Sequence, residues 1–212
     1  MRFTLLAFAS ILSFSAFTSP LLADNIHYPS VGQLAPAASL TAAHTGQVTG
    51  YFVSASAADN DSVELWDMSR NTFSGFLLPN HSSTPDVAVN FGSVNGGDRL
   101  AVILFNSTTG KHFDSINTDA TPTSFSVDGR NHAYVTPYTG GISGIPAGIY
   151  IGMEDLGVTS LKPLTGTDLD YNDDTFVFTN VAIAPTPEPG TFLLLGTGLL
   201  GAAGSLRRKF AR

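Results

Sequence analysis

The residues best suited to chemistry lie in one acidic segment in the C-terminal third of the chain. The segment reads Asp168-Leu169-Asp170-Tyr171-Asn172-Asp173-Asp174. Oxygen atoms at alternate positions can curl around one hard cation, and calcium in proteins takes about six to eight oxygen ligands. Asp168, Asp170 and Asn172 fit the first three ligand positions of an EF-hand loop. Asp173 stands where that loop needs glycine and Thr179 where it needs glutamate, so we reject an EF-hand and expect a calcium loop beside a strand.

A second acidic pair, Glu154 and Asp155, directly follows an apolar run at residues 149–153. If that run and residues 175–183 are neighbouring strands, the pair completes the ligand set around the cation. The predicted ligands are therefore Asp168, Asp170, Asn172, Asp173, Glu154 and Asp155, with calcium as the bound ion. The other interpretation is that these are exposed turn residues whose side chains cap their own backbone. Mutual repulsion among so many carboxylates favours the cation.

Templates for enzymes do not fit the sequence. It contains no phosphate-binding G-x4-G-K-[ST] loop and no H-E-x-x-H zinc motif. The absence of cysteine excludes disulfides and thiolate-held metals. Paired carboxylates can hydrolyse glycosides, but acids gathered in one loop suit a cation better. We therefore assign no catalytic residue, expect no enzyme, and read His132, four residues after Asp128, as a loop histidine with its hydrogen bonds satisfied.

The elements that must position the acidic segment are short apolar runs separated by Gly, Pro, Asn and Asp. Residues 99–106 are apolar on both alternating faces, which is typical of a central strand. No amphipathic helix of useful length is found in this region, and strands at this spacing indicate an antiparallel β-sandwich of jelly-roll or Ig-like type. The expected strands are residues 48–57, 62–68, 73–78, 86–92, 99–106, 123–127, 133–136, 148–153 and 175–183.

Both ends of the chain are hydrophobic and basic. Residues 1–23 begin with Arg2, continue through an apolar run and end on Ala23, which is typical of a secretory signal peptide and implies the Sec export machinery. At the other end, an uncharged stretch at residues 190–206 is just long enough to cross a bilayer. The basic residues at 207–212 would hold the tail on the cytoplasmic side.

This C-terminal end resembles the PEP-CTERM sorting signal, which consists of a Pro-Glu-Pro motif, a transmembrane segment and an Arg-rich terminus. Pro187, Glu188, Pro189, Arg207 and Arg208 match it in order. The resemblance implies an exosortase as partner, transient anchoring in the inner membrane, and release to the cell surface or extracellular matrix of a Gram-negative-type bacterium. It also implies an association with exopolysaccharide or biofilm.

Residues 48–183 resemble a β-rich domain of unknown function that many PEP-CTERM proteins carry. The likeness is in Tyr150-Ile151-Gly152-Met153-Glu154-Asp155, in the D-x-D-Y-N-D motif at residues 168–173, and in the segment at residues 128–133. It implies a surface-exposed, calcium-stabilised binding or structural module. One departure is Thr165-Gly166-Thr167, where the family commonly has a Gly-Gly before the motif.

Subtracting the two ends changes the charge of the protein. The whole chain has a net charge of -7 and a mean hydropathy of +0.16. Five of its ten Lys and Arg residues lie in the two ends, so residues 24–189 hold the other five and all 17 acids, a net of -12. This acidic charge excludes a basic nucleic-acid binder.

The predicted organisation is a signal peptide at 1–23, a flexible lead-in at 24–46, the sandwich at 47–183, a Pro-rich spacer at 184–189, a transmembrane segment at 190–206 and a cytoplasmic tail at 207–212. We expect an exported, non-enzymatic structural or adhesive protein that calcium stabilises and that bridges to anionic exopolysaccharide. The alternative is a secreted carbohydrate-binding or glycoside hydrolase-like protein.

Overall fold

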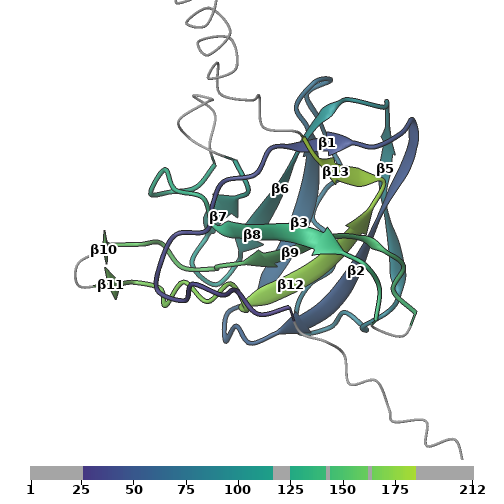
Figure 1. Ribbon diagram of the computed structural model, residues 1–212. Helices are drawn as coiled ribbons and strands as arrows, with labels where there is room; N and C mark the ends of the chain where they lie inside the picture. The colour runs from purple at the N-terminus through teal and green to yellow at the C-terminus, as the bar shows by residue number, and fades with distance from the viewer. Residues whose placement is uncertain (1–25, 117–124, 142–143, 162–163, 185–212) are drawn as a thin grey trace, which may run out of the picture.

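The structure is a computed structural model that describes residues 26–116, 125–141, 144–161 and 164–184. These residues form strands and turns, and none of them lies in a helix. The strands form two large antiparallel sheets and a small hairpin that projects from them (Figure 1). The elements are β1 (Leu40–Ala42), β2 (Gly46–Ala55), β3 (Asp61–Asp67), β4 (Thr72–Phe73), β5 (Ala88–Val94), β6 (Arg99–Asn106), β7 (Lys111–Asp114), β8 (Ala133–Tyr138), β9 (Gly148–Met153), β10 (Ser160–Leu161), β11 (Leu164–Thr165), β12 (Asp174–Thr179) and β13 (Val181–Ile183).

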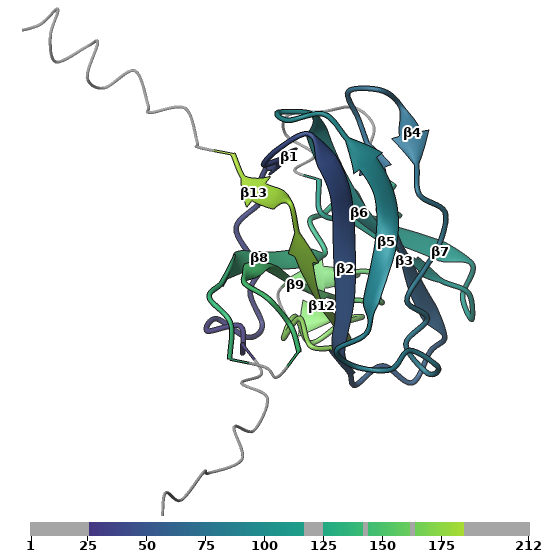
Figure 2. The same cartoon turned by 90° about the vertical axis from the view of Figure 1, so that its right-hand side faces the viewer.

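The two large sheets pack face to face. Sheet A has the order β13-β1-β6-β3-β4, with β7 also paired to β6, and sheet B has the order β5-β2-β12-β9-β8. Figure 2 shows β2 and β5 of sheet B in front of β6 and β3 of sheet A. Core side chains come from both, for example Val63 and Val102 from sheet A with Ile151 and Phe176 from sheet B. The predicted β-sandwich is confirmed.

The predicted central strand at residues 99–106 coincides with β6. It pairs with β3 along one side, and with β1 and β7 along the other. Its residues 100–104 are buried on both faces, because Val102 points into the sandwich while Ala101 and Ile103 pack under Trp66 and Ile116 on the outside.

The long strand expected at residues 175–183 is two strands in different sheets. Asn180 lies between β12 and β13 with a positive φ of 60°, a conformation that Asn tolerates better than most residues. There the chain leaves sheet B, and β13 pairs with β1 in sheet A. A single alternating run in the sequence carries no signal of this change of sheet.

Other boundaries also differ from the expectation. The run at 73–78 is reduced to β4 and an isolated bridge between Val63 and Leu77. Residues 125–127 form no strand, while 123–124, which begin that expected run, lie outside the described residues. β7 follows β6 as a hairpin that we did not predict.

Part of the expected lead-in at residues 24–46 is built into the domain. β1 pairs with both β6 and β13, and Tyr28 and Ala35 are buried against Leu169 and Tyr171. The Pro, Gly and small residues of this segment suggested a loose structure. Its few apolar side chains nevertheless pack on the buried residues of the acidic loop.

The predicted signal peptide, Pro-rich spacer, transmembrane segment and basic tail fall almost wholly outside the described residues. Among the residues that are described, no helix is long and apolar enough to cross a membrane.

Candidate metal centre

The two segments that carry the predicted ligands meet at one end of sheet B. β9 and β12 pair antiparallel, with Met153 opposite Asp174. Residues that follow β9 therefore lie beside residues that precede β12. The acidic pair at residues 154–155 and the loop at 168–173 are neighbours, as the predicted ligand set requires.

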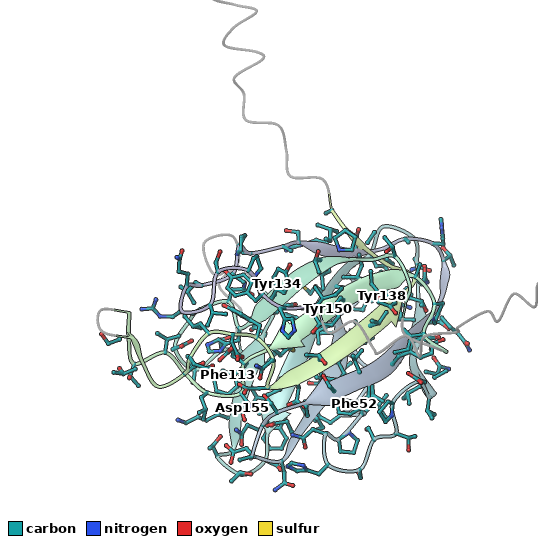
Figure 3. All side chains as sticks on the ribbon, turned by 60° about the horizontal axis from the view of Figure 1, so that its bottom comes forward. Phe52, Phe113, Tyr134, Tyr138, Tyr150 and Asp155 are labelled. Carbon is teal, nitrogen blue, oxygen red and sulfur yellow. The ribbon has the colours of Figure 1, made fainter. Side chains whose placement is uncertain are left out.

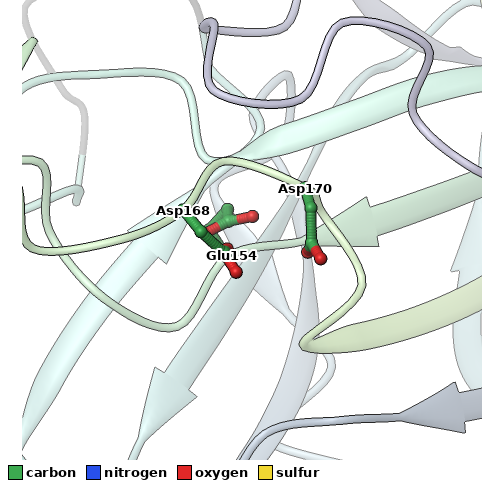
Figure 4. Close-up of side chains that lie close together, drawn as sticks. All are labelled: Glu154, Asp168 and Asp170. Carbon is green, nitrogen blue, oxygen red and sulfur yellow. The ribbon is translucent and has the colours of Figure 1, made fainter. Parts of the chain in front are cut away.

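Three of the predicted ligands converge. Glu154, Asp168 and Asp170 each offer an oxygen atom, and these atoms all lie within 4.8 Å of one another (Figure 4). Glu154 is fully buried, Asp170 is half-buried and Asp168 is exposed. The group therefore opens to solvent on one side, and oxygen atoms at this spacing can share one hard cation.

Glu154 is held by the loop that it faces. The Thr167 hydroxyl donates a hydrogen bond to Oε2, and the Tyr171 backbone N–H donates one to Oε1. Burial, followed by the negative charge of Asp173, raises the pKa of Glu154 to about 8, although the Tyr171 N–H acts in the opposite direction. Burial also raises the pKa of Asp170. A cation would offset the cost of both charges.

The loop reaches this arrangement through two bulky residues in the left-handed region. Leu169 and Tyr171 have φ values of 53° and 57°, which side chains of this size rarely adopt. Both side chains are buried, in contact with the segment around Tyr28 and Ala35. The Tyr171 hydroxyl accepts a hydrogen bond from the Ala35 N–H at 2.8 Å. Packing therefore holds the loop in a conformation that its sequence alone disfavours.

Gly152 lets the loop cross over β9. A Cβ atom at this position would collide with the backbone carbonyl oxygen of Tyr171. The glycine of the Tyr150-x-Gly152-x-Glu154 segment thus allows the same residue, Tyr171, to donate its N–H to Glu154. Its role is to admit the loop, since its φ lies outside the positive range.

Of the other three predicted ligands, Asn172 lies against this group, while Asp155 and Asp173 lie apart from it. The side-chain amide of Asn172 donates to Asp170 and accepts from the Ser56 hydroxyl. Asp173 accepts the Asp155 N–H at 3.1 Å through Oδ2, and Asp155 is itself buried at 4% exposure. The six residues that the sequence grouped around one ion therefore divide between two places.

Asp61 is a residue that the sequence analysis missed. It opens β3 and is 3% exposed, and its side chain lies in contact with those of Asp155 and Asp174. A signal was present, because Asp61 is in phase with Val63 and Leu65 and so faces the core.

Asp128 and His132 are joined by a hydrogen bond next to this end of the sandwich. The expectation that the hydrogen bonds of His132 are all satisfied is wrong, because its buried Nδ1 has no partner among the described residues. The His132 Nε2 lies 3.0 and 3.1 Å from the two Asp128 oxygens, and its ring packs on Phe113. Burial alone would raise the pKa of Asp128, but the hydrogen bond and charge of His132 lower it overall. Asp128 also accepts the Val158 N–H at 2.8 Å, so the pair fastens the loop after β9.

Comparison with known proteins identifies the C-terminal end of the chain. Residues 185–209 match the family model of the PEP-CTERM protein-sorting motif. The matched stretch includes Pro187, Glu188, Pro189, Arg207 and Arg208. The predicted sorting signal is confirmed. No curated protein and no solved structure matches the chain. The resemblance of residues 48–183 to a domain of unknown function stays a prediction.

The first testable prediction concerns Gly152. We expect Gly152→Ala to destabilise the protein by about 1–3 kcal/mol, because the added methyl group must displace the Tyr171 backbone. Urea denaturation at constant calcium measures this change. Gly157→Ala is the control, since its Cβ would meet only side-chain atoms, at 3.6 Å or more, and it should be neutral or slightly stabilising. Equal stability of the two variants would contradict the crossing geometry.

Proposed function

We propose that this protein is a structural or adhesive component of the cell surface or the extracellular polysaccharide matrix, delivered by exosortase processing and stabilised by calcium. Its sorting motif implies an exported protein that is transiently anchored in the membrane and processed by an exosortase. That motif is the single observation that carries the proposal. The surface or matrix destination and the calcium are our additions to it.

Calcium binding is supported by the convergence of Glu154, Asp168 and Asp170. A fully buried glutamate that faces two aspartates is unfavourable without a positive charge. In the described residues, no Lys or Arg forms an ion pair with any of the three. Calcium modules outside the cell bind the ion with Kd values of about 0.1–1 mM, an affinity that a partly exposed site such as this one can provide.

A non-enzymatic role is supported by the crowding of the same carboxylates. Glycoside hydrolysis needs two carboxyl groups on opposite sides of a sugar, separated by about 5 Å or more. The oxygens of Glu154, Asp168 and Asp170 gather around one point, and both Glu154 oxygens already accept hydrogen bonds. This arrangement favours a shared ion over an acid and base pair.

A carbohydrate-binding protein is the second candidate, and one pocket favours it. The pocket has a volume of about 360 Å³ and is lined by Asp67, Arg70, Phe73 and Asn90, among others. The Phe73 ring is 46% exposed and lies parallel to Trp66 at 5.5 Å. An exposed aromatic ring among hydrogen-bonding groups suits a sugar. Binding to a polysaccharide that is lost in Phe73→Ala and kept in Phe76→Ala, whose ring is also exposed, would favour this candidate.

Calcium should raise the melting temperature of the protein. Saturation at 100 times Kd adds about 2.7 kcal/mol, which corresponds to roughly 5–10 °C for a domain of this size. We expect Asp170→Asn to lose a large part of this rise, because it removes one ligand charge. Differential scanning calorimetry in calcium and in chelator measures the shift.

The matched control is Asp86→Asn, which removes one charge from an exposed residue and should keep the full rise. Asn tolerates the positive φ of 68° at that position. Identical melting temperatures of the wild type in calcium and in chelator would refute calcium stabilisation.

Exosortase processing should be visible in the mass of the exported protein. Intact-mass analysis of protein extracted from the cell surface is expected to show loss of the segment at residues 190–212. Glu188→Ala, which alters the Pro-Glu-Pro motif, should retain that segment and stay in the membrane fraction. Asp86→Asn, which removes an exposed charge far from the motif in the sequence, should be processed like the wild type. Recovery of surface protein that still carries residues 190–212 would contradict C-terminal processing.

A further inference from the structure

The core of the sandwich is polar at one end. Strand alternation puts Asp61 on the same face of β3 as Val63 and Leu65, and that face points between the sheets. Asn106, which pairs with Asp61, likewise follows the core-facing residues of β6. Sheet A therefore contributes a carboxylate and a carboxamide to the interior.

Sheet B contributes carboxylates to the same place. Asp174 is in phase with Phe176 and Phe178 on β12, and Asp155 extends the core-facing alternation that ends at Met153 on β9. Figure 3 labels Asp155 at the end of the sandwich where β12 begins. Glu154 falls on the opposite face of the sheet, so the metal centre described above is a separate group of residues.

The buried carboxylates contact one another in pairs. Asp61 is the central member, because its carboxyl group interacts with those of both Asp174 and Asp155. Asp155 in turn contacts Asp173. Asp61, Asp155 and Asp174 are 3%, 4% and 0% exposed, so water cannot screen the repulsion.

Several oxygens of this group have no partner. Both carboxylate oxygens of Asp174 and Oδ1 of Asp61 are buried and accept no hydrogen bond from any described residue. The remaining oxygen of Asp61 accepts only the Asn80 side-chain amide, at 3.2 Å. In the described part of the chain, the ion pairs of Lys and Arg involve none of these acids. Buried charges of one sign with unpaired oxygens demand a positive charge among them.

We propose that Asp61, Asp155, Asp173 and Asp174 form a buried binding site for a second divalent cation, which ties sheet A to sheet B. Carboxylate oxygens are the ligands that calcium prefers, and neither oxygen of Asp174 accepts a hydrogen bond from a described donor group. The four acids interact in pairs, and no three of them converge as closely as Glu154, Asp168 and Asp170 do. An ion with about six to eight oxygen ligands would therefore draw the pairs together around Asp61. Asp61 comes from β3 and Asp174 from β12, so the ion joins strands that share no hydrogen bonds.

The electrostatics of the group agree with this assignment. Burial, followed by the Asp61 charge, raises the pKa of Asp174 to about 9. Burial and then the charge of Asp155 raise the pKa of Asp173 to about 7. A divalent cation among these carboxylates would offset the same repulsion.

Counting bound calcium tests the proposal. The full chain, purified in detergent micelles and freed of metal with chelator, is dialysed against radioactive calcium at pH 7.5. We expect two ions per wild-type chain, and one ion in Asp174→Asn, which keeps the size of the side chain. Asp170→Asn should also bind one ion, the double variant none, and the exposed control Asp86→Asn two.

The outcomes separate this site from the metal centre at Glu154. If Asp174→Asn and Asp61→Asn both bind as many ions as the wild type, the buried site is refuted, whatever Asp170→Asn does. If only the buried variants lose an ion, the buried site stands and the outer centre fails. Should Asp174→Asn not fold, as judged by its near-ultraviolet circular dichroism, Asp61→Asn alone decides. One ion per wild-type chain that survives in Asp61→Asn would show that protons, not metal, occupy the group.

Discussion

Repulsion between buried carboxylates is the constraint on which this structure depends. Two acidic groups lie at one end of the sandwich, one around Glu154 on the outer face of sheet B and one around Asp61 between the sheets. Burial strengthens the repulsion around Asp61 and at Glu154, because the low dielectric of the interior screens charge poorly. Cations supplied from outside would turn each group from a source of strain into a clamp, one within sheet B and one between the sheets.

The fold is arranged to create this crowding. Pairing of β9 with β12 brings two distant acidic segments to one edge. Buried Leu169 and Tyr171 then hold the loop in an unusual conformation, and Gly152 gives it room to approach. Apolar packing thus overcomes both backbone strain and charge repulsion. Backbone strain and charge repulsion both lower the stability of the protein, and strain of this kind is common at sites that bind a ligand.

Location connects the acidic domain to the ends of the chain. Calcium is scarce inside cells and abundant outside, so a domain that needs it is best completed after export. The sorting motif at residues 185–209 directs such an export and a transient membrane anchoring. In our proposal the positively charged ends direct export and sorting. The domain with a net charge of -12 then becomes fully stable only where calcium is available, outside the cell.

The sequence by itself determined the sorting signal, the all-β class, the central strand β6 and the acidic segment, because each depends on residues that are close together in the chain. It could not show that β12 and β13 lie in different sheets, because one uninterrupted pattern of alternating residues runs through both strands. It also grouped Glu154 with Asp155, although successive residues of an extended chain face opposite sides of a sheet. Only the tertiary structure divided them, because Glu154 met the loop outside sheet B while Asp155 met Asp61, a residue from the other sheet and far away in the chain.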